Sequence, residues 1–384
     1  MFIPLSVPNL KGNELKYVTE AIESEWVSTG GEYITKFEQN IAKYLNVDMA
    51  VACQSGTSAI HLALLESGVS SDDEVIVPTL TFIAAVNPVM YCMAHPVFMD
   101  CNDSLTLDPV KLHEFCTNEC DFIKGKLINK KTKRHIKAII VVHVFGNMAD
   151  MEKIMDIAEK YNIIIIEDAT EALGTVYLDG KYKNKYAGTI GDFGCYSFNG
   201  NKIITTGGGG MLVARNKEKL LNAKHISTQA KSDAINYIHD EVGYNYRMTN
   251  LQAAVGVAQL EQLEKFIKVK QENYFLYKSL LENDDNVKLL EFREGIRSNY
   301  WFYSLLLKNA NTKKAEVINK LSENQIQTRP IWGLIHEQIP YINCQSYEIE
   351  KAKYYYERVI NIPCSSNLTK EQVNRVAANI RGIV

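Results

Sequence analysis

The feature that most constrains the fold is a pair of β-branched runs separated by a helical pattern. Residues 137–143 and 163–167 are rich in Ile and Val, and residues 150–161 between them carry apolar side chains at helical spacing. Parallel strands that are buried on both faces show such runs. Strand–helix–strand repetition implies right-handed crossovers. The sequence therefore predicts an α/β domain built on a largely parallel sheet.

The same alternation continues on both sides of these runs. We expect further strands at 49–53, 75–77, 96–99, 194–197, 210–214 and 301–307. We expect further helices at 57–67, 82–93, 109–120, 249–264, 313–324 and 370–380. After Gly191 the strands shorten around a glycine-rich loop, which indicates a change of architecture. We place a large domain at residues 1–255 and a small α+β domain at 256–384.

Length and charge narrow the class of protein. At roughly 150 residues per domain, 384 residues fit two or three domains. The 46% of hydrophobic residues is enough for a full core and argues against disorder. Lys and Arg number 42 against 45 Asp and Glu, which gives a net charge of −3. We therefore expect a globular enzyme without nucleic-acid partners, because nucleic-acid binders need a clustered positive excess.

Residues 75–99 contain no Asp, Glu, Lys or Arg and could be taken for a membrane span. Pro78, Pro88 and Pro96 interrupt the segment, so a buried strand, a helix and a second strand fit it better. The first residues lack a basic region followed by an apolar stretch, so we expect no signal peptide. No membrane partner is expected.

The eight cysteines show no C-x-x-C pair, and a chain of this length needs no disulfide framework. Reduced thiols in the cytoplasm are the simplest interpretation. A helix could bring His113, Cys116 and Cys120 to one face, but the sequence offers no fourth ligand for a metal ion. We expect an ordinary helix face there and no metal site.

Three separate motifs carry candidate chemistry. Ser55-Gly56-Thr57 follows a predicted strand and opens a predicted helix, where main-chain N–H groups bind anions. The alternative is a plain helix cap. Asp168 follows a buried strand, at the edge of the sheet where α/β proteins bind ligands. Its alternatives are a salt bridge and a cap on the next helix.

Lys202 is the third candidate, because it lies between Asn201 and the glycine run 207–210. The surrounding residues match neither the P-loop nor the G-x-G-x-x-G pattern. An anion site, an acid at a strand end and a lysine in a glycine loop together suit pyridoxal phosphate. That cofactor needs a phosphate cradle, a carboxylate beside its pyridine nitrogen and a lysine amine.

The sequence also resembles the DegT/DnrJ/StrS sugar aminotransferases, nearly from end to end. The resemblance lies in WVSTG (26–30), SGTSAIH (55–61), DEVIVP (73–78), DATEALG (168–174), residues 197–211 and GYNYRM (243–248). It implies the aspartate-aminotransferase fold, which is fold type I of pyridoxal phosphate enzymes. It also implies a homodimer with shared active sites, L-glutamate as amino donor with 2-oxoglutarate released, and a nucleotide-linked keto sugar as acceptor.

The resemblance implies a role for individual residues as well. Lys202 would carry the cofactor as a Schiff base and move the proton, while the cofactor alternates with pyridoxamine phosphate. Asp168 would pair with the pyridinium nitrogen. The remaining residues that it assigns to cofactor binding are Gly56, Thr57 and Ser197 at the phosphate, Phe82 on the ring, Glu171 near the phenolic oxygen and Asn245 at the partner's phosphate. Those assigned to the sugar nucleotide are Ser28, Thr29, Trp332 and His336. Without the resemblance, Phe82 and Trp332 would be interpreted as core aromatics.

One position narrows the substrate. Relatives often have Glu where this chain has Gly208, and the approach Asn199-Gly-Asn-Lys202 looks most like enzymes that make 4-amino-4,6-dideoxy-N-acetyl sugars. The resemblance therefore implies amination at C4 of a nucleotide-linked 4-keto-6-deoxy sugar, of the kind used for bacillosamine or legionaminic acid in bacterial surface glycans. The alternatives are a perosamine-type or C3-ketosugar aminotransferase and a catalytically silent homologue. The sequence leaves the carrier nucleotide open.

Overall fold

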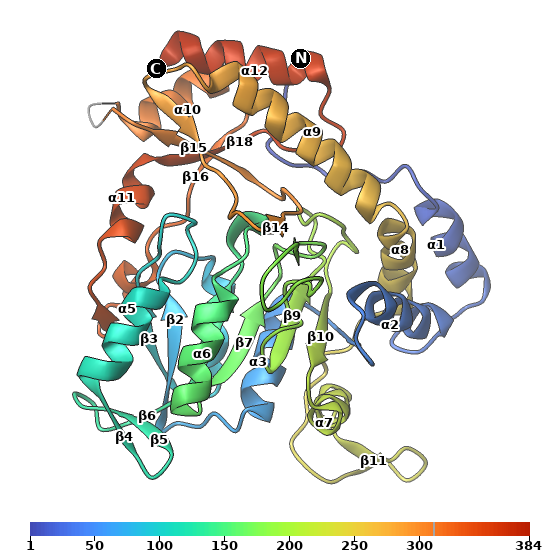
Figure 1. Cartoon of the computed structure of the whole chain (residues 1–384). Helices are drawn as coiled ribbons and strands as arrows, with labels where there is room; N and C mark the ends of the chain where they lie inside the picture. The colour runs from blue at the N-terminus through green and yellow to red at the C-terminus, as the bar shows by residue number, and fades with distance from the viewer. Residues whose placement is uncertain (310–311) are drawn as a thin grey trace.

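The computed structural model describes residues 1–309 and 312–384, and a mixed but mainly parallel sheet forms its centre (Figure 1). The strand order of the sheet is β1-β10-β9-β7-β6-β2-β3-β17. These strands are Val51–Cys53 (β1), Gly210–Ala214 (β10), Phe193–Ser197 (β9), Ile164–Asp168 (β7), His135–Val142 (β6), Asp73–Pro78 (β2), His95–Met99 (β3) and Gln345–Tyr347 (β17). Only β10 runs antiparallel to its neighbours along this path through the described strands. This confirms the predicted fold class.

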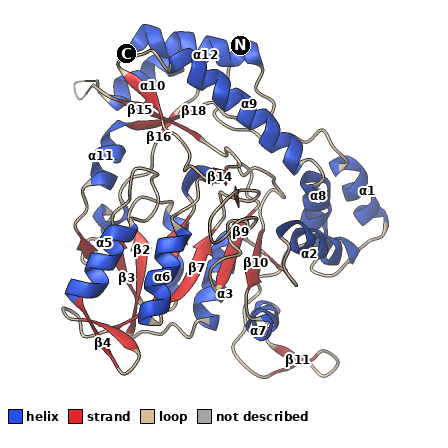
Figure 2. Ribbon diagram, in the orientation of Figure 1, coloured by secondary structure: helices blue, strands red, loops and turns tan. Residues whose placement is uncertain are grey.

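Helices cover both faces of the sheet, with α5 and α6 in front and α3 behind in the view of Figure 2. Their bounds are Pro109–Glu114 (α5), Met151–Tyr161 (α6) and Gly56–Glu66 (α3). Both faces are therefore apolar, which explains why β2, β6 and β7 are Val- and Ile-rich and buried almost throughout. The ligand-binding edge lies where β7 and β9 end, at Asp168 and Ser197.

A smaller sheet with the strand order β13-β15-β18-β16 lies above the carboxyl ends of the large sheet (Figure 1). Its strands are Val287–Leu289 (β13), Tyr303–Leu307 (β15), Val359–Ile362 (β18) and Arg329–Pro330 (β16). The helices Leu263–Leu281 (α9), Lys314–Glu323 (α10), Lys351–Arg358 (α11) and Lys370–Ile383 (α12) surround it. The boundary proposed at residue 255 lies inside α8, Asn250–Leu260, and the two-domain division stays a prediction.

The N-terminal residues are hydrogen bonded to segments next to this small sheet, although the sheet itself is built from the last third of the chain. The Ile3 N–H donates to the Gln325 carbonyl over 2.8 Å, and the Gln327 N–H donates to the Ile3 carbonyl over 2.9 Å. The Cys364 N–H donates to the Leu5 carbonyl over 2.8 Å. The chain then crosses to the helices Glu14–Glu23 (α1) and Glu32–Leu45 (α2), which pack against α8.

Three expected helices differ from the structure. The segment 82–93 is a 3₁₀ turn, Ile83–Ala85, followed by the short helix Asn87–Tyr91 (α4), because Pro88 permits only a fresh helix start there. Helix α5 passes into a π-helical turn, Phe115–Glu119, and Cys120 begins the hairpin Cys120–Ile123 (β4) and Lys126–Asn129 (β5). The expected helix at 249–264 ends at Leu260 and restarts as α9.

The remaining elements are short, except for the helix Lys217–Ser227 (α7). They are the strands Val176–Tyr177 (β8), Lys231–Asp233 (β11), Ile238–His239 (β12) and Ile296–Arg297 (β14), with 3₁₀ turns at Val144–Gly146, Ile335–Glu337 and Ile339–Tyr341. No helix within the described residues is long and apolar enough to cross a membrane. The charge-free segment 75–99 forms β2, α4 and β3, as predicted.

Candidate active site

A cavity of about 270 Å³ opens at the carboxyl ends of β7 and β9. Its walls come from both sheets: the first turn of α3, the strand ends and the glycine loop from below, and the segments at 301–302 and 332 from above. Eight of the residues singled out from the sequence line it: Gly56, Thr57, Phe82, Asp168, Glu171, Ser197, Lys202 and Trp332. The fold therefore gathers in one place side chains that lie up to 276 residues apart.

The first turn of α3 forms the floor of the cavity. Ser55 is the N-cap, and its hydroxyl oxygen accepts a hydrogen bond from the Ser58 N–H over 3.0 Å. The cap and the anion site thus coexist, since Gly56 and Thr57 still face the cavity. A Cβ atom at Gly56 would lie 2.9 Å from the Ser197 Cβ and 2.8 Å from the Thr170 Cγ2. Glycine at this position lets the helix start approach Ser197.

The glycine loop reaches the same turn by strand pairing. β10 pairs with β1, and Ser55 forms an isolated bridge with Gly209. Gly209 has a φ of +122°, and a Cβ atom there would lie 2.6 Å from the Thr206 Oγ1. Only glycine fits this backbone without strain. The loop therefore presses its main chain against α3 and leaves Lys202 at the cavity wall.

Asp168 is buried at the last position of β7. Its Oδ1 accepts a hydrogen bond from the Thr170 N–H over 3.0 Å. Burial raises the pKa of the Asp168 carboxyl, and the hydrogen bonds from Thr170 and the charge of Lys202 oppose that rise. A carboxylate in this setting gains most when a cationic N–H group of a ligand meets it.

Glu171 is buried beside Lys202. Its Oε2 accepts a hydrogen bond from the Phe145 N–H over 2.8 Å, and its Oε1 lies 3.5 Å from the Lys202 Nζ. Burial raises the pKa of Glu171 to about 7, against opposing effects from Lys202 and the Phe145 N–H. Near neutral pH this carboxyl can therefore gain or lose a proton, which suits a group that exchanges protons with a ligand.

Lys202 lies between Glu171 and an indole ring. Its Nζ is 4.2 Å from the ring centroid of Trp301, within range for a cation–π contact. The Trp301 Nε1–H donates to the carbonyl of Asn201 over 2.8 Å, beside the lysine itself. Trp301 belongs to the segment that leads into β15 of the small sheet. Lys202 was predicted from the sequence, whereas Trp301 was not.

The aromatic side chains predicted for this site lie at its rim. Phe82 is 54% exposed, which excludes the core interpretation, and Trp332 packs on Phe145 with ring centroids 4.5 Å apart. His336 does not line the cavity: its Nδ1 is hydrogen bonded to the Thr79 Oγ1 over 2.6 Å, and burial lowers its pKa.

Three further predicted residues, Ser28, Thr29 and Asn245, do not line the cavity. Ser28 and Thr29 precede α2, where the Ser28 carbonyl accepts a hydrogen bond from the Asn250 N–H over 2.6 Å. Asn245 is exposed, and its Oδ1 accepts a hydrogen bond from the Arg247 Nε–H over 2.9 Å. Within one chain these residues do not complete the site.

The residues that sequence reasoning missed include Trp301, Phe302 and Thr170, which all line the cavity. Thr170 lies two positions after Asp168, so that proximity in sequence was an available signal. Trp301 and Phe302 come from a different sheet, and nothing in the sequence near them indicates the contact with Lys202. Asn199 and Asn201 also line the cavity, as neighbours of Lys202 in its loop.

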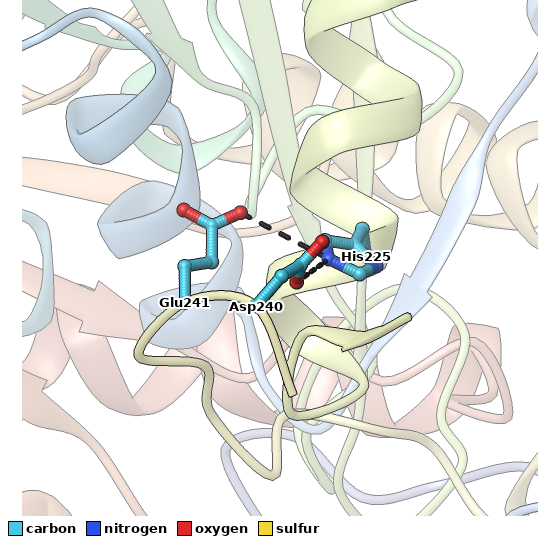
Figure 3. A group of neighbouring side chains, drawn as sticks. All are labelled: His225, Asp240 and Glu241. Atoms are coloured by element: carbon cyan, nitrogen blue, oxygen red, sulfur yellow. Dashed lines mark hydrogen bonds and ion pairs between the residues drawn. The ribbon is translucent and has the colours of Figure 1, made fainter. Parts of the chain in front are cut away.

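Figure 3 shows a separate cluster on the surface, formed by His225, Asp240 and Glu241. The His225 Nε2 lies 2.7 Å from the Asp240 Oδ1 and 4.0 Å from the Glu241 Oε1. These ion pairs fasten the loop after β12 to the last turn of α7. The set His113, Cys116 and Cys120 does not share a helix face, because Cys120 belongs to β4.

The donor set in the cavity fits pyridoxal phosphate. The first turn of α3 and Ser197 offer N–H and hydroxyl groups to a phosphate, and the absence of a side chain at Gly56 keeps that turn accessible. Asp168 is a buried carboxylate that a pyridinium N–H would satisfy, and Lys202 supplies the amine.

Comparison with known proteins agrees with this fit. The model of the DegT/DnrJ/EryC1/StrS aminotransferase family matches residues 8–381. The chain is 39% identical to a GDP-perosamine synthase from Escherichia coli O157:H7 over 380 residues, which cover 99% of this chain and 98% of that protein. It is 28% identical to a UDP-4-amino-4,6-dideoxy-N-acetyl-beta-L-altrosamine transaminase from Campylobacter jejuni, covering 100% and 97%.

Among solved structures, the chain resembles Helicobacter pylori PseC, an aminotransferase involved in the biosynthesis of pseudoaminic acid. The TM-score is 0.89 at 22% identity, and the match covers 100% of this chain and 99% of PseC. Other structures of the same fold were solved in PLP and PMP forms. The likeness confirms the fold that the sequence predicted.

Proposed function

Because the chain belongs to the DegT/DnrJ/EryC1/StrS aminotransferase family, we propose that it transfers the amino group of L-glutamate to C4 of a nucleotide-linked 4-keto-6-deoxy sugar. The chain is a PLP-dependent sugar aminotransferase, and the position of amination and the donor are the proposed part. The single observation that carries the proposal is the convergence of Asp168, Glu171 and Lys202 on one cavity above the first turn of α3.

Each residue has a task that its surroundings support. Pyridoxal phosphate, when bound, supplies a ring that accepts electrons from the carbon that loses a proton. The buried carboxyl of Asp168 would accept a hydrogen bond from the ring nitrogen and keep that nitrogen protonated. Lys202 would take the proton from one carbon and return it to another, and the α3 turn with Ser197 would hold the phosphate. Glu171, with a pKa of about 7, would take up or release a proton next to the Lys202 amine.

Two acceptor sugars remain in competition. The proposal of an N-acetylated acceptor sugar, of the legionaminic acid or bacillosamine type, is supported by Gly208, which lines the cavity without a side chain. A Cβ at Gly208 would meet only the Gln252 Nε2, at 3.4 Å, so the glycine is not needed by the backbone and leaves room for a substrate group. The alternative acceptor, a GDP-linked sugar without an N-acetyl group, is supported by the 39% identity with a GDP-perosamine synthase.

We also propose that the enzyme works as a cytoplasmic homodimer with shared sites. Asn245 is exposed and does not line the cavity of its own chain, so a partner subunit is the place where it would reach a phosphate. The surface nearby is apolar: Tyr91 is 52% exposed, and both Tyr91 and Tyr244 pack their rings against His61. Burial of such a surface against a second copy is favourable.

The test uses the purified protein loaded with pyridoxal phosphate. We expect a visible absorption band that disappears when L-glutamate is added, and we expect a 4-keto-6-deoxy sugar to restore it. GDP-linked and UDP-linked N-acetyl sugars are compared by kcat/KM, and NMR of the product locates the new amine. A band that ignores glutamate would refute the donor, and an amine at C3 would refute the proposed position.

A further inference from the structure

The contact between Lys202 and Trp301 joins the two sheets of the molecule at the reacting amine. The Lys202 Nζ lies 4.2 Å from the centre of the indole ring. Trp301 is 2% exposed and the Lys202 side chain 13%, so most of the contact is removed from water, which strengthens a cation–π interaction. The lysine comes from the loop after β9 and the tryptophan from the segment before β15.

Trp301 is held from several directions. Its Nε1–H donates to the Asn201 carbonyl over 2.8 Å, and its main-chain N–H donates to the Asn299 Oδ1 over 3.0 Å. The ring of Phe302 stacks on it with centroids 4.1 Å apart and planes 5° from parallel. The indole therefore has a fixed position relative to the loop that carries Lys202.

A second lysine anchors Trp301 from the small sheet. Lys270 of α9 is 3% exposed, and its Nζ donates to the Trp301 carbonyl over 3.0 Å and to the Cys364 carbonyl. The Lys270 carbonyl in turn accepts a hydrogen bond from the Tyr303 hydroxyl over 2.6 Å. A buried ammonium is costly unless such oxygens surround it, so these bonds are strong constraints on the segment.

Glu171 is the other neighbour of Lys202, and its attraction for the Lys202 ammonium depends on pH. Glu171 lies 3.5 Å away, and with a pKa of about 7 it is partly protonated near neutral pH. A protonated carboxyl attracts an ammonium far less than a carboxylate does. The indole face does not titrate and attracts the ammonium at every pH.

From these contacts we propose that Trp301 is a positioning residue, which holds the Lys202 amine in the cavity whenever that amine is not joined to the cofactor. The inference rests on the proposed role of Lys202. During turnover the substrate amine replaces the lysine, and a free lysine side chain has many rotamers in which it would leave the cavity. The indole restricts it to the position from which it reaches the reacting carbon.

The first experiment uses the protein without cofactor, and it measures how fast an amine-selective reagent labels Lys202, by peptide mass spectrometry relative to the exposed Lys181. We expect Trp301→Leu to increase labelling of Lys202 about tenfold. Trp301→Phe should stay close to the wild type, because Phe keeps an aromatic face. Both substitutions remove the indole N–H and its hydrogen bond to the Asn201 carbonyl, so the loss of that bond alone would affect both variants alike.

Tyr300→Leu is the matched control. Tyr300 precedes Trp301 in the chain, but its ring packs on other aromatic side chains. Its ring centroid lies 5.2 Å from that of Tyr274 and 4.8 Å from that of Phe292. This variant should lower the melting temperature and leave the labelling of Lys202 unchanged. Equal labelling of Lys202 in wild type, Trp301→Phe and Trp301→Leu would overturn the proposal, and so would a tenfold increase in the Tyr300 variant.

The second experiment follows the visible band of the loaded enzyme after mixing with L-glutamate. In Trp301→Leu the band should form, and its loss should be about tenfold slower at saturating glutamate, with the half-saturating concentration nearly unchanged. Trp301→Phe should recover most of the rate. A wild type that forms no band refutes the proposed function itself, whereas a normal rate in Trp301→Leu refutes only the positioning role.

Discussion

At the scale of single residues, Lys202 is the side chain whose loss should matter most. In Lys202→Ala we expect turnover to fall by more than about a thousandfold, because the proton has no carrier. Pyridoxal phosphate should still bind, without a covalent bond to the protein, since the phosphate and pyridine contacts remain. Absorption spectra before and after gel filtration measure this. Steady-state activity near the wild-type level would remove Lys202 from the catalytic role.

Glu171 should make the stability of the cofactor-free protein depend on pH. Its pKa rises from 4.5 to about 7 on folding, so the folded state binds a proton more tightly than the unfolded chain. The resulting stabilisation is complete below about pH 4.5 and is lost as the pH rises through about 7. The rise corresponds to on the order of 3 kcal/mol.

Glu171→Gln removes this titration and keeps an oxygen for the Phe145 N–H. We therefore expect the variant to gain stability relative to the wild type between pH 5 and pH 8, and denaturant unfolding at both values measures the difference. A constant difference across this range would contradict the raised pKa.

The residues of the site differ in how far the sequence revealed them. Asp168 was predictable because it follows a recognisable strand and α/β sheets bind ligands at strand ends, and Lys202 because it precedes a glycine run. Trp301 was not predictable, because its partner Lys202 is 99 residues earlier in the chain and belongs to another sheet. Its place depends on how the two sheets meet, which no local pattern describes.

At the scale of elements, the start of α3 tolerates no side chain at Gly56 without a shift of the helix. In Gly56→Ala the new Cβ would lie 2.8 Å from Thr170 and 2.9 Å from Ser197, so the helix start must move away from Ser197. We expect a loss of about 1 to 3 kcal/mol in the free energy of unfolding and a cofactor affinity at least about tenfold lower.

Gly200→Ala is the matched control for that variant, because a Cβ at Gly200 meets no atom within 4 Å. It should leave both stability and pyridoxal phosphate affinity close to the wild type. Fluorescence titration and thermal unfolding of the two variants make the comparison. Equal affinities would show that the close approach at Gly56 has no part in binding.

Elements with a strong local pattern were predicted well. The strands β6 and β7 follow continuous Ile and Val runs, and α8 begins at a capping box of Thr249 and Gln252. The expected helix over 109–120 failed at its end, where the chain makes a π-helical turn and pairs Cys120 with Asn129 in a hairpin. Strand pairing outcompeted helix propensity there, and pairing partners cannot be deduced from one segment alone.

At the scale of the whole molecule, the proposed homodimer with shared active sites predicts that two inactive variants restore each other. The Lys202→Ala variant lacks the amine but keeps Asn245, whereas the Asn245→Ala variant keeps Lys202 and lacks the Asn245 amide. If they are unfolded together and refolded in equal amounts, half of the dimers are mixed and each has one intact site. We expect roughly a quarter of wild-type activity. Activity that stays at the level of the separate variants would refute the shared site.

The pairing of Ile3 with Gln325 and Gln327, and of Leu5 with Cys364, also has a consequence for synthesis on the ribosome. Residues 3 and 5 are translated more than 300 residues before the partners to which they are hydrogen bonded. At about 5 to 20 residues per second, the N-terminal segment waits on the order of 20 to 60 s for its partners. The large sheet can form in that interval, so the last stretch of the nascent chain closes around a core that is already folded.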